Sequence, residues 1–228
     1  MELFHLAVII LSFVLLLLLG VPVAFSIGLS TLAAMLLSVD PGAAVTTVAQ
    51  RLATGLDSYA LLAIPFFILS GELMSRGGVA RRLISLAKVL VGRLPGALAY
   101  INILAAMLFG AISGSAVASA AAIGGFMTPM MKKEGYDPDY SAAVNITSAV
   151  TGLIIPPSNV MIVYSVASGG VSIGALFIAG YIPGILLGAS LMVAAGIVAF
   201  KKGYPVAARA KLREAFLRFL DALPSLFL

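Results

Sequence analysis

The chain alternates between long apolar runs and short clusters of polar or charged residues. A hydrocarbon core about 30 Å thick is crossed by about 20 consecutive apolar helical residues. Four runs approach that length and predict membrane-crossing helices: 3–19, 21–39, 59–74 and 173–200. A tight break at 20–22 separates the first two runs, because Gly and Pro interrupt the helix there.

Three further segments have a mixed pattern. In 76–93 and again in 201–220, Lys and Arg alternate with Leu, Ile and Val, as is typical of basic amphipathic helices lying at a membrane surface. Residues 43–57 predict a short interfacial helix. Glu72 stands four residues before Arg76, so we expect an ion pair between them at the membrane edge rather than a proton carrier.

The segment 96–131 contains no charged residue. If it turns at 113–116, where the sequence reads Ser-Gly-Ser-Ala, each half reaches only about 27 Å. That length favours a re-entrant hairpin, although two full crossings would also return the chain to the same side. After a polar loop at 132–139, the next apolar run, 140–167, is broken by Ile-Pro-Pro-Ser-Asn at 155–159. Two consecutive prolines remove two helix hydrogen bonds, so this helix is predicted to be discontinuous.

Composition agrees with an all-α integral membrane protein, since 61% of the residues are hydrophobic and only 10% are charged. The chain has no cysteine, which excludes disulfides and thiolate metal sites. Its net charge of +5 does not indicate nucleic-acid binding, because the basic residues separate apolar runs. If 76–93, 132–133 and the residues from 201 onward lie in the cytoplasm, Arg51 is the one Lys or Arg left outside, and the N-terminus lies in the periplasm.

The two predicted helix breaks are the candidate sites of chemistry. Broken helices that face each other expose carbonyl oxygens at one end and amides at another, and so can bind a cation and an anion. Each break also has an explanation without a bound ion: close packing of small residues at the first, and a ligand-free proline kink at the second. Taken together, the breaks indicate an ion site, with neighbouring Ser, Thr and Asn side chains as oxygen ligands.

Catalysis is not indicated. An intramembrane enzyme is suggested only by Ser113 and Ser115, and no histidine follows His5 to serve as a base. Every Asp lies outside or at the edge of a predicted span, so neither a serine dyad nor an aspartyl pair can form. We therefore predict no catalytic residue, no cofactor and no metal ion other than Na⁺.

Five stretches carry a family resemblance. They read Phe-Gly-Ala-Ile-Ser-Gly-Ser-Ala at 109–116, Ala-Ala-Ile-Gly at 121–124 followed by Pro129, Gly-Tyr at 135–136, Gly-Leu-Ile-Ile-Pro-Pro-Ser at 152–158, and Ile-Pro-Phe-Phe-Ile-Leu-Ser-Gly-Glu at 64–72. In this combination the sequence resembles the large membrane subunit of tripartite ATP-independent periplasmic (TRAP) transporters, in its N-terminal half.

The resemblance implies a Na⁺-coupled importer of organic acids, such as C4-dicarboxylates or sialic acid, in the cytoplasmic membrane of a bacterium or archaeon. Its partners would be a small membrane subunit, a periplasmic substrate-binding protein and a C-terminal half absent from this chain. The fold would be one half of an inverted-repeat, elevator-type transporter. Residues 1–95 would supply scaffold and arm helices, 96–168 the transport-domain hairpin (96–131) and broken helix (140–168), and 169–228 a further span and arm helix before the second repeat.

The resemblance also implies a site. The Na⁺ ligands would come from Ser113, Gly114, Ser115, Ala116, Gly152, Ile155, Pro156 and Ser158. The substrate contacts would come from Ser115, Asn145, Thr151, Pro157 and Asn159. Two other readings stay open: another ion-coupled anion transporter with paired hairpins, and a membrane assembly scaffold that does not transport.

Overall fold

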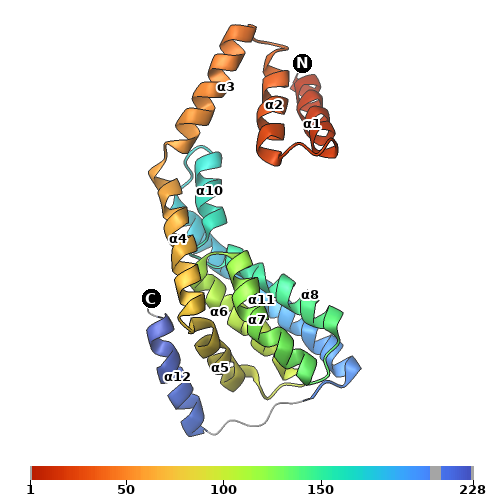
Figure 1. Ribbon diagram of the computed structural model, residues 1–228, viewed down its shortest axis with the longest axis vertical. Coiled ribbons are helices and arrows are strands. Elements are labelled where there is room, and N and C mark those ends of the chain that lie inside the picture. The colour runs from red at the N-terminus through yellow and green to blue at the C-terminus, as the bar shows by residue number, and fades with distance from the viewer. Residues whose placement is uncertain (1, 206–211, 227–228) are drawn as a thin grey trace. The chain divides into compact units, whose positions relative to one another are not determined.

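The computed structural model describes residues 2–205 and 212–226, and every regular element in that part of the chain is helical (Figure 1). The predicted all-α class is therefore confirmed. The chain divides into two compact units, Met1–Ser58 and Tyr59–Leu228.

The first unit consists of α1 (Glu2–Leu18), α2 (Val23–Met35) and α3 (Pro41–Leu56). Gly20, at φ +79°, makes the predicted tight turn between α1 and α2. Helix α2 is shorter than the predicted span 21–39, because turns replace the helix after Met35. Asp40 then begins α3 by accepting a hydrogen bond from the Gly42 amide at 3.0 Å.

Among the described residues of the second unit, two helices are long and apolar enough to cross a membrane, namely α4 (Tyr59–Arg76) and α11 (Ile173–Lys202). A third crossing can be made by Pro138–Ile154 together with Asn159–Ala167, which are bent by 52° at the break between them. At the end of α4, the predicted ion pair is present, with Arg76 Nε 2.8 Å from Glu72 Oε1.

The centre of the second unit is α6 (Ala97–Ser113), where Ile101, Ile103 and Phe109 are fully enclosed. Around it pack α5 (Val79–Val91), α7 (Ala116–Lys133) and α8 (Pro138–Ala149). Short α9 (Thr151–Ile154) and α10 (Asn159–Ala167) follow. Helix α5 corresponds to the predicted basic helix of 76–93 but is shorter, since Arg76 ends α4 and Arg93 follows α5. Its apolar face is buried and its basic face is exposed.

The second basic segment differs from its prediction. Lys201 and Lys202 form the last turn of α11, where cations favour the negative end of the helix dipole, and Gly203, at φ +66°, ends the helix. In the described residues the basic amphipathic helix is α12 (Leu212–Leu226), which lies beside α5 (Figure 1). The prediction of one basic helix from 201 to 220 is therefore wrong at its start.

A cluster of tyrosines joins the loop before α8 to the end of α11. The rings of Tyr136 and Tyr204 are stacked with centroids 4.1 Å apart, and the Asp137 amide donates to the Tyr204 hydroxyl at 3.1 Å. Lys202 Nζ lies 3.0 Å from Asp137 Oδ2. The hydrogen bond from Lys202 is the largest cause that lowers the pKa of Asp137 below its usual value.

Candidate functional site: two facing helix breaks

The first break connects α6 to α7. Gly114, at φ +61°, adopts a left-handed conformation that glycine accepts without strain, and its amide closes α6 on Gly110 O at 2.8 Å. Ser115 is extended and begins α7, its Oγ accepting from the Ala118 amide at 3.3 Å. The predicted turn at Ser-Gly-Ser-Ala is thus present.

The second break connects α9 to α10, as the prolines predict. Pro156 and Pro157 have no N–H, so the helical donors expected by Gly152 O and Leu153 O are both missing. The Ser158 hydroxyl replaces one of them by donating to Leu153 O at 2.5 Å. Gly152 O is left without its helical donor, and it points along α9 toward the break.

The two breaks are in direct contact. The Asn159 amide donates to Gly114 O at 3.3 Å. A Cβ added to Gly114 would lie 2.8 Å from Pro157 O, and one added to Gly110 would lie 2.3 Å from the Cα of Gly152. Neither approach leaves room for a side chain, so glycine is required where α6 passes the second break.

The breaks also repeat one local geometry. Ser115 has φ −136° and ψ 122°, and Ser158 has φ −135° and ψ 125°. Each serine begins a helix by accepting from the amide three residues later at 3.3 Å, Ala118 for the first and Met161 for the second. Two helix N-termini, with their partial positive charge, therefore start from adjoining loops.

The helices that form the breaks carry no charged side chain, since 96–131 and 140–200 contain no Asp, Glu, His, Lys or Arg. They offer only backbone dipoles and neutral oxygens. The neighbouring helix α4 brings Gly71 beside Ser113, and its charged residues Glu72 and Arg76 are exposed and paired with each other. The amide oxygen of Asn159 is buried and has no hydrogen-bond partner among the described residues. Within that part of the chain, no cluster of three or more His, Asp and Glu residues could hold a transition metal.

Most of the predicted site residues are brought together. The two breaks contain, side by side, Ser113, Gly114, Ser115, Ala116, Gly152, Ile155, Pro156, Pro157, Ser158 and Asn159. Ser113 is fully buried there. Thr151 is also enclosed, and it donates back to Ser148 O at 2.6 Å.

Asn145 lies apart from this group. It precedes Gly152 by about 10 Å along the helix, and its Nδ2 donates to Ala120 O at 3.1 Å. A Cβ on Gly124 would lie 2.1 Å from the same Nδ2, so the amide side chain fills the gap that this glycine leaves between α7 and α8.

Two groups of supporting residues were missed from the sequence. Asn102, fully buried in α6, donates to Ser148 Oγ at 2.9 Å and ties the hairpin to the broken helix. On α11, a Cβ at Gly180 would lie 2.5 Å from Ile154 O, and one at Gly184 would lie 2.5 Å from Ile155 Cγ1. The four-residue spacing of glycines 180, 184 and 188 is a signal that could have identified this contact.

Together, the apolar crossing helices and the paired discontinuities define a polytopic helical membrane protein with unwound backbone enclosed by its own helices. Comparison with known proteins then identifies the family. The profile of the tripartite ATP-independent periplasmic transporter DctM component matches residues 10–228, and the chain belongs to this family.

Individual relatives agree with that assignment. YgiK of Salmonella typhimurium is 58% identical over 217 residues, which is 95% of this chain and 50% of the relative. The sialic acid TRAP transporter large permease protein SiaM of Vibrio cholerae is 39% identical over 91% of this chain and 48% of its own. The C4-dicarboxylate TRAP transporter large permease protein DctM of Rhodobacter capsulatus is 37% identical over 93% and 51%. The chain thus spans about half the length of these relatives.

Proposed function

We propose that this chain supplies the first hairpin and the first broken helix of a Na⁺-coupled importer of organic acids in the cytoplasmic membrane. The observation that carries the proposal is the contact between the breaks, where the Asn159 amide meets Gly114 O. Relatives named for transport of sialic acid and C4-dicarboxylates support a carboxylate substrate. A small membrane subunit, a periplasmic binding protein and a second permease half would complete the transporter.

The chemistry of the donors suits Na⁺. A hard cation prefers neutral and anionic oxygens, and the site offers Gly152 O and the unpartnered Asn159 amide oxygen together with serine hydroxyls. The N-termini of α7 and α10 present amides from the same region, which favours an anionic carboxylate beside the cation. A bound cation would strengthen that preference by adding a full positive charge next to the carboxylate.

Helix lengths support a re-entrant hairpin. Helix α6 has 17 residues and α7 has 18, so each rises only about 25–27 Å, less than a hydrocarbon core about 30 Å thick. Non-helical backbone at such depth requires enclosure by protein, which the Gly110–Gly152 contact supplies. In an elevator mechanism, α6 to α10 would move together, since Asn102 and Asn145 bond α6 and α7 to α8.

The test is uptake of radiolabelled organic acids into proteoliposomes. They would contain a permease of full family length that includes this chain, with its small subunit and binding protein. We expect uptake to require an inward Na⁺ gradient and the binding protein, and to be abolished by Ser115→Leu. Ser190→Leu, at an exposed position on α11, is the matched control and keeps uptake. Uptake without Na⁺ contradicts ion coupling, and normal uptake by Ser115→Leu contradicts the site.

A further inference from the structure

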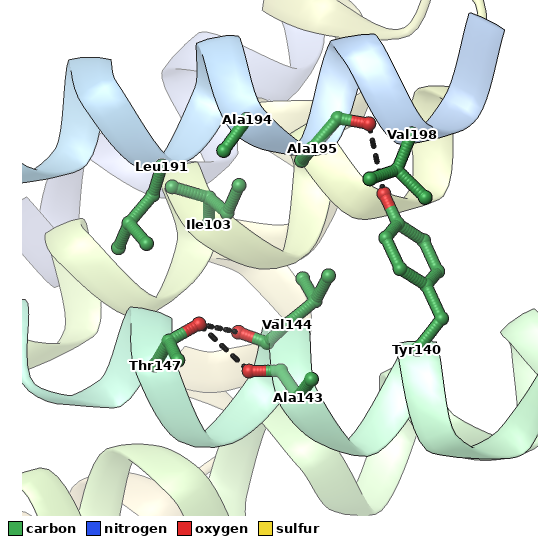
Figure 2. A pocket seen from close by; sticks show the side chains of 9 residues that line it. All are labelled: Ile103, Tyr140, Ala143, Val144, Thr147, Leu191, Ala194, Ala195 and Val198. Atoms are coloured by element: carbon green, nitrogen blue, oxygen red, sulfur yellow. Dashed lines mark hydrogen bonds between the residues drawn. The ribbon is translucent and has the colours of Figure 1, made fainter. Parts of the chain in front are cut away.

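A groove of about 280 Å³ lies between α8 and α11, away from the two breaks (Figure 2). Figure 2 shows Tyr140 and Val198 at one end, Leu191 and Thr147 at the other, and Ile103 of α6 between the two helices. The remaining lining residues are Ala143, Val144, Ala194 and Ala195.

The groove offers nothing to a polar ligand. Its two polar side chains are both engaged, since the Tyr140 hydroxyl donates to Ala195 O at 3.0 Å and Thr147 Oγ1 donates to Ala143 O at 2.7 Å (Figure 2). All other lining residues are Ala, Val, Leu or Ile. A polar solute entering the groove would lose its hydration without gaining new hydrogen bonds, so the fitting occupant is a hydrocarbon.

The groove and the lysine beyond its end together match one leaflet of a bilayer. Helix α11 rises about 15 Å from Leu191 to Lys201, which is half of a hydrocarbon core of about 30 Å. Lys201 follows Val198 by three residues and therefore lies above the groove on the same face of α11. Lys202 is paired with Asp137, whereas Lys201 is exposed and has no ion-pair partner among the described residues.

The size of the groove favours a single chain of carbon atoms over a helix. A dry cavity of about 150 Å³ holds one benzene molecule, so 280 Å³ accommodates a segment of several methylene groups. A helix about 10 Å wide needs more than twice that volume over the same length. Val193 and Ile197 do not line the groove and are 64% and 53% exposed elsewhere on α11.

We propose that this groove binds one acyl chain of an anionic phospholipid, whose phosphate lies at Lys201. The lysine ammonium supplies the charge complementarity at the headgroup, and the walls of α8 and α11 supply the apolar contact. The site depends on the membrane location of α11 and not on the transport activity.

The experiment uses the purified chain in phosphatidylcholine nanodiscs. A trace of phosphatidylglycerol with a diazirine on its acyl chain is cross-linked by light, and labelled peptides are mapped by mass spectrometry. We expect labelling on both walls, in 140–147 and 191–198, several-fold above that given by the matching phosphatidylcholine probe. Lys201→Gln should reduce the phosphatidylglycerol labelling about fivefold and leave the phosphatidylcholine labelling unchanged.

Substitutions that fill the groove with a larger side chain give the decisive test. Ala194→Phe should abolish the wall labelling, whereas Val193→Phe, one residue away on the exposed face, should keep it. Ala143→Leu fills the groove from α8 and decides the result if Ala194→Phe fails to fold. Equal labelling by the two probes, or labelling that persists in both filled variants, overturns the proposal. Cross-links from the groove to another polypeptide overturn it as well.

Discussion

Substitution of Gly110 by alanine tests whether the contact between α6 and α9 sets the geometry of the site. The new Cβ would lie 2.3 Å from Gly152 Cα, whereas ordinary contacts of this kind begin near 3.4 Å. The obstacle is backbone and cannot rotate away. The two helices must therefore separate by at least about 1 Å, since overpacked cores respond by shifting their backbone.

The expected change in the free energy of unfolding of Gly110→Ala follows from two opposing effects. Overpacking of a close contact costs about 1–3 kcal/mol. Replacement of glycine by alanine inside a helix returns about 1 kcal/mol through propensity. Gly125→Ala, in α7, receives the same propensity gain but has no atom within 4 Å of the added Cβ. The difference between the two variants therefore isolates the clash.

The assay is a Na⁺ titration of uptake, combined with thermal unfolding in detergent. We expect Gly110→Ala to unfold at a lower temperature than Gly125→Ala and to raise the half-saturating Na⁺ concentration at least tenfold, equivalent to about 1.4 kcal/mol. Displacement of a bound group by 1 Å is known to cost on the order of 10²-fold in enzymes, which sets the upper scale. If both variants give the same Na⁺ dependence and the same stability, the close contact does not position the site.

Three further predictions concern a helix cap, a charge pair and a close helix contact. Ser158→Ala removes the acceptor for Met161 N and should lower the free energy of unfolding by about 1–2 kcal/mol, while Ser190→Ala, measured by the same thermal unfolding, should leave it nearly unchanged. Asp137→Asn keeps an N-cap but loses the charge that pairs with Lys202. The pKa of Asp137 is lowered in the folded protein, so the wild type should be more stable than Asp137→Asn above the unfolded pKa. This difference in stability should vanish as the pH falls through the folded pKa. Melting curves of both proteins between pH 7 and pH 3 measure it. Gly184→Ala should shift Ile155 and weaken Na⁺-dependent uptake, and unchanged uptake would contradict the supporting role of α11.

The breaks were predictable because they depend on local chemistry. Consecutive prolines at 156 and 157 cannot continue a helix, and Ser-Gly-Ser at 113–115 supplies a left-handed glycine and an N-cap within three residues. The same signals predicted the C-terminus of α6 and the N-termini of α7 and α10. Helix α11 extends past its predicted end at 200 because a lysine such as Lys201 can either begin a basic amphipathic helix or stabilise the end of an apolar one.

The contacts across the fold were not predictable in the same way. The approach of Gly110 to Gly152 joins residues far apart in sequence, and a single glycine in an apolar helix does not indicate its partner. Likewise, Asn102 stands alone in an apolar run, and only its hydrogen bond to Ser148 explains its burial. Asn145 has two ends with different surroundings: its Nδ2 donates to Ala120 O beside Gly124, whereas its buried Oδ1 has no hydrogen-bond partner among the described residues. Its predicted contact with substrate stays a prediction.

The two breaks share one local geometry but end the preceding helix by different means. At both, a serine in extended conformation caps the helix that follows. Helix α6 ends by turning through Gly114, whereas α9 ends because Pro156 and Pro157 have no amide to donate. The amide of the left-handed Gly114 satisfies Gly110 O, whereas the prolines remove the helical donor of Gly152 O. In the proposed site, the second break would therefore contribute more oxygen ligands to the cation. The first break would mainly fix their position through Gly114 O and the Asn159 amide.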